Sequence, residues 1–73
     1  MKIKIESIEQ IGDKIKILFM ERNRIRFTMA TPKVVEYIRK RNPEFIGFEV
    51  GQELNVIPVP YKDSMGYKIA GVL

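Results

Sequence analysis

The stretch that decides the fold is residues 14–29, KIKILFMERNRIRFTM, in which basic and apolar residues alternate on both sides of a short polar interruption. Alternation with a period of two is typical of a strand with one face in the core and the other in solvent. The stretch therefore predicts two antiparallel strands joined by a loop at residues 21–23.

The same alternation predicts which side chains of this hairpin face the core. The predicted inward side chains are Ile15, Ile17 and Phe19 from the first strand and Ile25, Phe27 and Met29 from the second. The predicted outward side chains are Lys14, Lys16, Leu18 and Met20 from the first strand and Arg24, Arg26 and Thr28 from the second. A three-residue loop with Asn23 in the left-handed conformation places the inward side chains opposite one another. One face is then core, and the other is basic with two apolar patches, at Leu18 and at Met20.

Residues 2–11 predict a strand that leads into this hairpin through a turn at residues 12–13, Gly-Asp. Ile3 and Ile5 alternate with lysines, but Ile8 falls out of phase with them. A β-bulge near Ser7 restores the phase and bends the strand.

One helix is predicted after the hairpin, at residues 31–41. Thr31 is a good N-cap, and Pro32 suits the first helical position because its missing N–H would be unpaired there. Val34 and Ile38 lie one turn apart and form the expected core-facing stripe.

An apolar connection follows the helix at residues 44–51. Its glycines permit tight turns. We expect Phe45, Phe48 and Val50 to pack against one end of the core.

The remaining sequence predicts two strands. Residues 52–60 form the first, and Pro58 and Pro60 place its far end at a sheet edge because proline has no N–H to donate. Residues 61–66 predict a loop, and residues 67–73 predict the final strand.

The predicted element order is strand-strand-strand-helix-strand-strand. This is the order of the five-stranded OB barrel, in which the helix lies between the third and fourth strands. We therefore predict a mainly β fold, with residues 1–73 forming a single small five-stranded OB-like barrel and one helix at about 31–41. An SH3-like small barrel, or an open sheet with one packed helix, is the alternative.

Composition argues against several kinds of function. The 73 residues include no cysteine and no histidine, so a disulfide framework, a cysteine zinc site and a histidine base are excluded. We therefore expect no cofactor, no metal and no enzymatic activity. No apolar run reaches the length of a membrane span, and we expect a cytoplasmic protein.

The basic outer face of the hairpin predicts binding of nucleic acid, most simply single-stranded DNA or RNA. The chain has 13 Lys and Arg against nine Asp and Glu, a formal net charge of +4. The residues expected to contact phosphates or bases are Lys4, Lys14, Lys16, Arg22, Arg24, Arg26, Tyr61, Lys62 and Tyr67. The cations would meet phosphates, and the two tyrosines would stack on bases.

A second class of function uses the same face. Leu18 and Met20 lie among the basic residues and could form the centre of an interface with another protein or with a second copy of the chain. A purely structural interpretation is also open, because outward cations keep strands soluble and the tyrosines could simply cover the core. The sequence does not distinguish among a DNA, an RNA and a protein partner.

Overall fold

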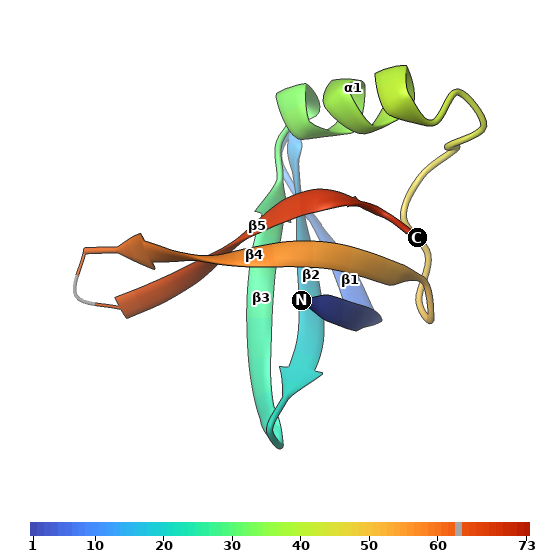
Figure 1. Ribbon diagram of the computed structural model, residues 1–73. Coiled ribbons are helices and arrows are strands. Elements are labelled where there is room, and N and C mark those ends of the chain that lie inside the picture. Colours follow the sequence, from blue (N-terminus) through green and yellow to red (C-terminus); the bar gives the residue numbers. More distant parts are fainter. Residues whose placement is uncertain (63) are drawn as a thin grey trace.

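The structure is a computed structural model that describes residues 1–62 and 64–73, except for the side chain of Tyr61. The elements, in chain order, are β1 (Lys2–Ile11), β2 (Lys14–Glu21), β3 (Arg24–Ala30), α1 (Pro32–Arg41), β4 (Glu53–Tyr61) and β5 (Ser64–Val72), as Figure 1 shows. The strands form one antiparallel sheet in the order β3-β2-β1-β4-β5. The prediction of a mainly β fold with a helix between the third and fourth strands is confirmed.

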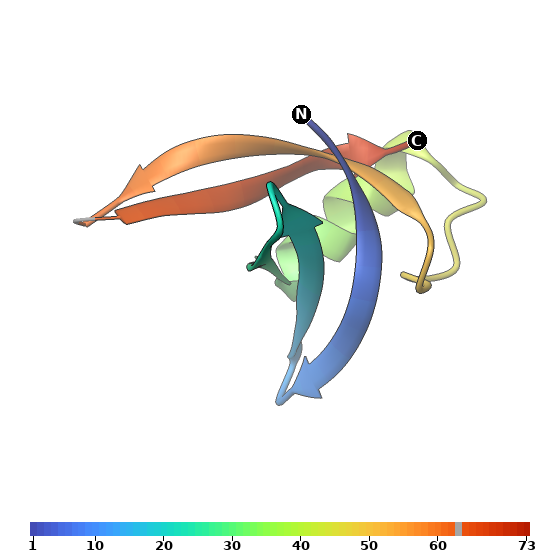
Figure 2. The ribbon, with the colours of Figure 1, turned by 90° about the horizontal axis from the view of Figure 1, so that it is seen from below.

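The sheet is open, with β3 and β5 as its edges. Its strands curve strongly, β1 most visibly (Figure 2), and the curvature brings the two edges toward each other. The hydroxyl Oγ1 of Thr28 on β3 donates a hydrogen bond to the carbonyl oxygen of Tyr67 on β5, at 2.8 Å. A side chain thus bridges the two edges.

The bend in β1 lets one strand serve both halves of the sheet. Its register shifts between Ile5 and Ser7, which confirms the predicted bulge. Before the bend, residues 2–4 pair with residues 53–55 of β4, and after it, residues 7–11 pair with β2.

The β2–β3 hairpin has a two-residue turn instead of the predicted three-residue loop. Glu21 pairs with Arg24, and the turn residues Arg22 and Asn23 have φ angles of 51° and 65°. A two-residue turn with positive φ at both positions matches the right-handed twist of the strands it joins. The register is therefore shifted by one residue, and every side chain of β3 lies on the face opposite to the predicted one.

The shift exposes the large side chains of β3. Ile25 is 69% exposed and Phe27 is 53% exposed, whereas Thr28 is only 2% exposed. The prediction that Ile25, Phe27 and Met29 lie in the core is wrong, and so is the outward placement of Thr28. Small residues suit the inner face at this position, because β3 approaches β5 there and Thr28 makes the bridging hydrogen bond.

The core gathers side chains from every strand and from the helix. Its buried members are Ile3, Ile5, Ile17, Phe19, Ala30, Ile38, Leu54, Val56 and Ile69. The side-chain oxygen of Thr31 accepts a hydrogen bond from the backbone N–H of Val34, so the predicted helix cap is confirmed. The helix covers one end of the sheet with Ile38 buried and Val34 partly buried, as predicted (Figure 1).

The connection between α1 and β4 packs on the core through two aromatic rings. Phe45 and Phe48 are partly buried and meet edge to face, with ring centroids 5.1 Å apart. Val50 is exposed, so its predicted packing role is wrong. The adjacent backbone N–H of Gly51 donates to the carbonyl oxygen of Ile5, and this bond holds a turn from which Val50 points outward.

The strands β4 and β5 form a long arm that projects from the sheet (Figure 1). The predicted loop at residues 61–66 is wrong, because pairing continues to Tyr61 and resumes at Ser64. Pro58 and Pro60 lie beyond the part of β4 that pairs with β1, so they sit where β4 has a partner on one side only. Their predicted edge placement is confirmed.

The register makes opposite predictions for two phenylalanines. Phe19→Ala removes a fully buried side chain and should lower the free energy of unfolding by about 3–5 kcal/mol, a large share of the roughly 4–11 kcal/mol expected of a domain of this size. Phe27→Ala removes an exposed side chain and should cost no more than about 1 kcal/mol. Urea unfolding of both variants measures the difference. Similar costs for the two would place Phe27 in the core and contradict the register.

Candidate nucleic-acid interface

The outer face of β2 and β3, which we call the hairpin face, is apolar at its centre. Three cross-strand pairs form it: Lys16 with Met29, Leu18 with Phe27, and Met20 with Ile25. Met20, Ile25 and Phe27 are exposed, and Leu18 is half-buried. The predicted apolar patches at Leu18 and Met20 are therefore extended by the side chains that the register turns outward.

A cation lies against the exposed aromatic ring of this face. The Nζ atom of Lys16 is 4.8 Å from the ring centroid of Phe27. The positive charge is attracted by the electron-rich face of the ring. An aromatic ring beside an ammonium group can stack on a nucleobase while the cation meets a phosphate.

The charge of the protein is concentrated in this hairpin. Residues 14–30 contain five cations and one carboxylate, a net charge of +4 that equals the formal net charge of the whole chain. The cations are Lys14, Lys16, Arg22, Arg24 and Arg26. Clustered charge of one sign attracts a polyanion from a distance and raises its rate of association.

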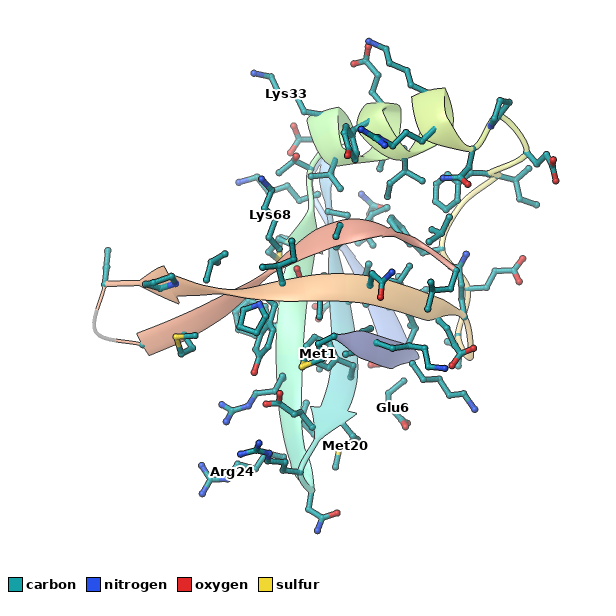
Figure 3. The ribbon with its side chains drawn as sticks, viewed as in Figure 1. Met1, Glu6, Met20, Arg24, Lys33 and Lys68 are labelled. Atoms are coloured by element: carbon teal, nitrogen blue, oxygen red, sulfur yellow. The ribbon has the colours of Figure 1, made fainter. Side chains whose placement is uncertain are left out.

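The hairpin cations occupy two faces instead of one. Lys14 and Lys16 lie on the outer face, as predicted, but Arg24 and Arg26 lie on the opposite face, where they pair with Glu21 and Phe19 across the ladder. The prediction that both arginines point outward with the lysines is wrong, for the same reason as the β3 register. Figure 3 shows Met20 and Arg24 near the hairpin tip, on opposite sides.

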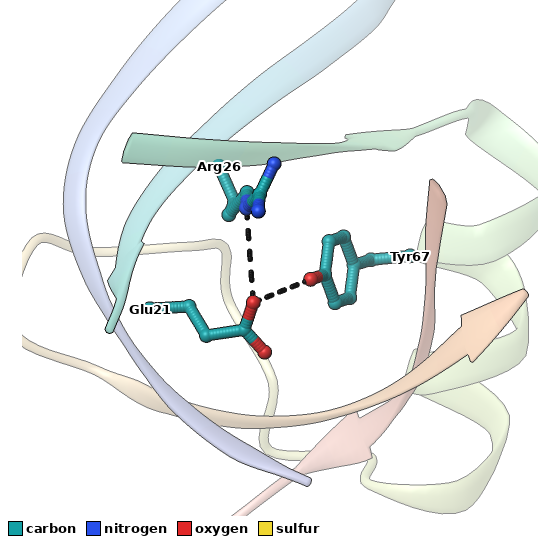
Figure 4. A network of polar contacts seen from close by, with 3 residues as sticks. All are labelled: Glu21, Arg26 and Tyr67. Atoms are coloured by element: carbon teal, nitrogen blue, oxygen red, sulfur yellow. Dashed lines mark hydrogen bonds and ion pairs between the residues drawn. The ribbon is translucent and has the colours of Figure 1, made fainter. Parts of the chain in front are cut away.

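A polar network fills the inner side of the hairpin tip, beyond the apolar core (Figure 4). The hydroxyl of Tyr67 donates a hydrogen bond to Oε1 of Glu21 at 2.7 Å, and Nε of Arg26 lies 3.7 Å from the same oxygen. The Tyr67 ring meets Phe19 edge to face, with centroids 5.2 Å apart. Glu21, Arg26 and Tyr67 thus tie β2, β3 and β5 together.

The environment of Tyr67 raises the pKa of its phenol above the ordinary value of 10.0. The hydrogen bond to Glu21 is the main cause, and burial and the negative charge of Glu21 add to it. The positive charges of Arg26 and Arg22 act in the opposite direction. Tyr67 is therefore a neutral donor that covers the core at this point.

The remaining predicted contacts lie outside the hairpin. Lys4 is on β1, opposite Glu53 of β4, and Lys62 is in the turn that ends the β4–β5 arm. The side chain of Tyr61 lies outside the described residues. The structure therefore brings Tyr67 close to Arg26, through Glu21, and leaves Lys14 and Lys16 on the opposite face of the hairpin.

A groove of about 570 Å³ separates β3 from the β4–β5 arm, and we call it the β3 groove. Residues 25–29 line one wall, and the other wall includes Val59, Met65 and Tyr67. Its lining is mainly apolar, and Arg26, Thr28, Ser64 and Tyr67 contribute polar groups. Because Phe27 lines the groove and also belongs to the hairpin face, the two surfaces are continuous.

Sequence reasoning missed that Phe27, Ile25 and Met29 lie on the outer face of the hairpin. The signal that identifies them is the pair Arg22-Asn23, which can form a complete two-residue turn. A shift of the loop by one residue turns all three outward together.

Comparison of the chain with models of protein families, with curated proteins and with solved structures gave no match. Within residues 1–62 and 64–73, no group of three or more acidic, cysteine or histidine side chains is placed to hold a metal ion. In the same part of the chain, no helix has the length and apolar character needed to cross a membrane. The geometry of the hairpin is therefore the basis for a functional proposal.

The Tyr67–Glu21 hydrogen bond predicts a specific dependence of stability on pH. Tyr67→Phe should lower the free energy of unfolding by about 1–2 kcal/mol at neutral pH, because it removes a hydrogen bond to a carboxylate. The pKa of Tyr67 is higher in the folded state than in the unfolded state, so its contribution is complete below about pH 10 and is lost as the pH rises through the folded value. Urea unfolding of both proteins from pH 7 to 11 measures this, and a difference that grows above pH 10 would contradict the assignment.

Proposed function

We propose that this protein binds single-stranded nucleic acid, DNA or RNA, on the hairpin face and along the β3 groove. The observation that carries the proposal is the exposed ring of Phe27 beside Lys16, on a hairpin whose net charge of +4 equals that of the whole chain. Phe27 and its apolar neighbours would contact bases, and the hairpin cations would contact phosphates. A single strand is favoured because its bases are free to stack on a side chain, whereas duplex bases are paired.

The fold supports this assignment of surface. Five strands in the order β3-β2-β1-β4-β5, with the helix between β3 and β4, agree with an OB-like barrel opened between β3 and β5. The Thr28–Tyr67 hydrogen bond lies where such a barrel would close. OB barrels bind oligonucleotides on the face of their second and third strands together with the loops at its rim. The proposed activity is binding without catalysis.

Self-association is the second candidate, and the apolar content of the hairpin face favours it. The face brings together Leu18, Met20, Ile25, Phe27 and Met29. Contiguous exposed apolar side chains often mark contacts between proteins. Two copies could cover this face on each other, with the cations arranged around it.

Fluorescence anisotropy with a labelled 15-nucleotide oligothymidine or oligouridine tests the proposal. If about four hairpin cations contact phosphates, affinity should fall roughly 50-fold between 50 and 200 mM salt. Phe27→Ala should weaken binding by roughly 5- to 150-fold at either salt concentration, because a stacking contact is worth about 1–3 kcal/mol per base. Lys16→Gln should also reduce the dependence on salt.

Two matched controls use the helix. Tyr37→Ala removes an exposed aromatic ring from α1, and Lys33→Gln removes an exposed cation from it. Both should bind the oligonucleotide like the unaltered protein. Absence of binding at 50 mM salt, or equal effects of Phe27→Ala and Tyr37→Ala, would overturn the proposal. A dimer in light scattering that Phe27→Ala converts to a monomer, without oligonucleotide binding, would support self-association instead.

A further inference from the structure

A second groove lies between α1 and the β4–β5 arm, and we call it the helix groove. It has a volume of about 350 Å³ and is lined by Lys33, Val34 and Tyr37 from α1 and by Ile57, Lys68 and Ile69 from β4 and β5. The proposed nucleic-acid interface uses none of these side chains.

The helix groove is apolar inside. Ile69 is buried and Val34 is partly buried, so they form its floor. Tyr37 is 45% exposed and Ile57 is 50% exposed, which leaves two large apolar surfaces open to solvent on its walls. The volume is at the small end for a ligand pocket and suits one or two apolar side chains.

The rim of the helix groove is cationic. Lys33, near the start of α1, and Lys68, on β5, are both exposed and extend to the same side of the molecule (Figure 3). The guanidinium group of Arg41 lies 4.8 Å from the ring centroid of Tyr37 and adds a third positive charge. Among residues 1–62 and 64–73, no acidic residue lines the groove.

The nearby negative charge is already paired. Glu36 on α1 forms an ion pair with Lys40, at 3.7 Å. In the described part of the chain, neither Lys33 nor Lys68 lies within ion-pair distance of a carboxylate. Both lysines are therefore available to an anionic partner.

We propose that the helix groove docks an acidic peptide segment of a partner protein, with one or two apolar side chains of the segment inserted between Tyr37 and Ile57. Carboxylates of the segment would pair with Lys33 and Lys68, and the inserted side chains would cover Ile69. Charge complementarity selects an acidic partner, and the apolar interior selects one with hydrophobic residues. A nucleic acid is less favoured here, because the net positive charge of the chain lies in residues 14–30 and not around this groove.

The helix groove and the β3 groove share no lining residue: Tyr67 and Val59 line the β3 groove, whereas Lys68 and Ile57 line the helix groove. The peptide and a nucleic acid could therefore be bound together. The peptide proposal does not depend on the proposed function and fails or holds separately.

Amide chemical shifts of the isotope-labelled protein test the proposal at 150 mM salt. The probe is a synthetic 12-residue peptide of Asp and Glu with Leu and Phe four positions apart. The expected result is a set of shifts centred on Val34, Tyr37, Lys68 and Ala70, with little change at Phe27. One control peptide replaces Leu and Phe by Ser, and a second replaces Asp and Glu by Asn and Gln, and both should bind at least about tenfold more weakly.

Charge-reversal variants distinguish binding of the peptide at the helix groove from attraction by the overall positive charge of the protein. Lys33→Glu combined with Lys68→Glu should weaken peptide binding by about tenfold or more. The matched control, Lys14→Glu combined with Arg24→Glu, makes the same charge change on the hairpin and should alter peptide binding less than about threefold, since 150 mM salt screens charges beyond about 8 Å. Ile57→Ser tests the apolar contact without adding charge, and its spectrum also reports whether the fold is kept.

Four outcomes would overturn the proposal. Three of them are no shifts at millimolar peptide, equal binding of the peptide in which Ser replaces Leu and Phe, and shifts centred on the hairpin face. A fourth is an oligothymidine that shifts Val34, Tyr37 and Lys68 in place of the peptide, which would make nucleic acid the occupant. Phe27→Ala should leave peptide binding unchanged whether or not it affects nucleic-acid binding.

Discussion

The two-residue turn at Arg22 and Asn23 is the constraint on which the rest of this structure depends. It sets the register of β2 against β3. Because side chains alternate between the two faces of a strand, a shift of one residue moves every side chain of β3 to the other face. With this turn, Thr28 faces inward and can bridge to β5, whereas Phe27 faces solvent. The core, the edge contact and the candidate interface all follow from the same two residues.

Local features of the fold were predictable because local chemistry determines them. Thr31 caps the helix, and the bulge near Ser7 corrects a visible break in phase. Hydrophobicity did not predict which side chains of β3 face inward, because the apolar core does not extend as far as the hairpin tip. Only small residues, Thr28 and Ala30, are needed inside, and the larger apolar side chains of the strand had no remaining core to enter. The rule that large apolar side chains face the core therefore placed Phe27 inside, although it is exposed.

The inner side of the hairpin tip shows how the structure compensates where apolar packing ends. Glu21, Arg26 and Tyr67 make a polar clasp between β2, β3 and β5. Arg26 takes part in this clasp because the register of β3 places it on the inner face instead of the predicted outer face. A domain of 73 residues has little apolar surface to spare, so Phe27, Ile25 and Met20 in solvent weaken its packing. Under the proposed function, a contact with bases would cover these three side chains and bury the apolar surface that the fold leaves exposed.

The distribution of charge distinguishes the two proposed binding surfaces, the hairpin face with the β3 groove for nucleic acid and the helix groove for an acidic peptide. Outside residues 14–30 the chain has eight cations and eight carboxylates, a formal net charge of zero. This part of the chain, which contains the helix groove, therefore has no excess positive charge to attract anions. The attraction of the helix groove for anions is local to Lys33, Lys68 and Arg41 and is screened within about 8 Å at physiological salt. Under the proposed function, a long polyanion would be drawn to the hairpin, where the unbalanced charge lies. In the proposed peptide site, a short acidic segment would pair with Lys33 and Lys68 and would bind well only when its apolar side chains also fit the groove.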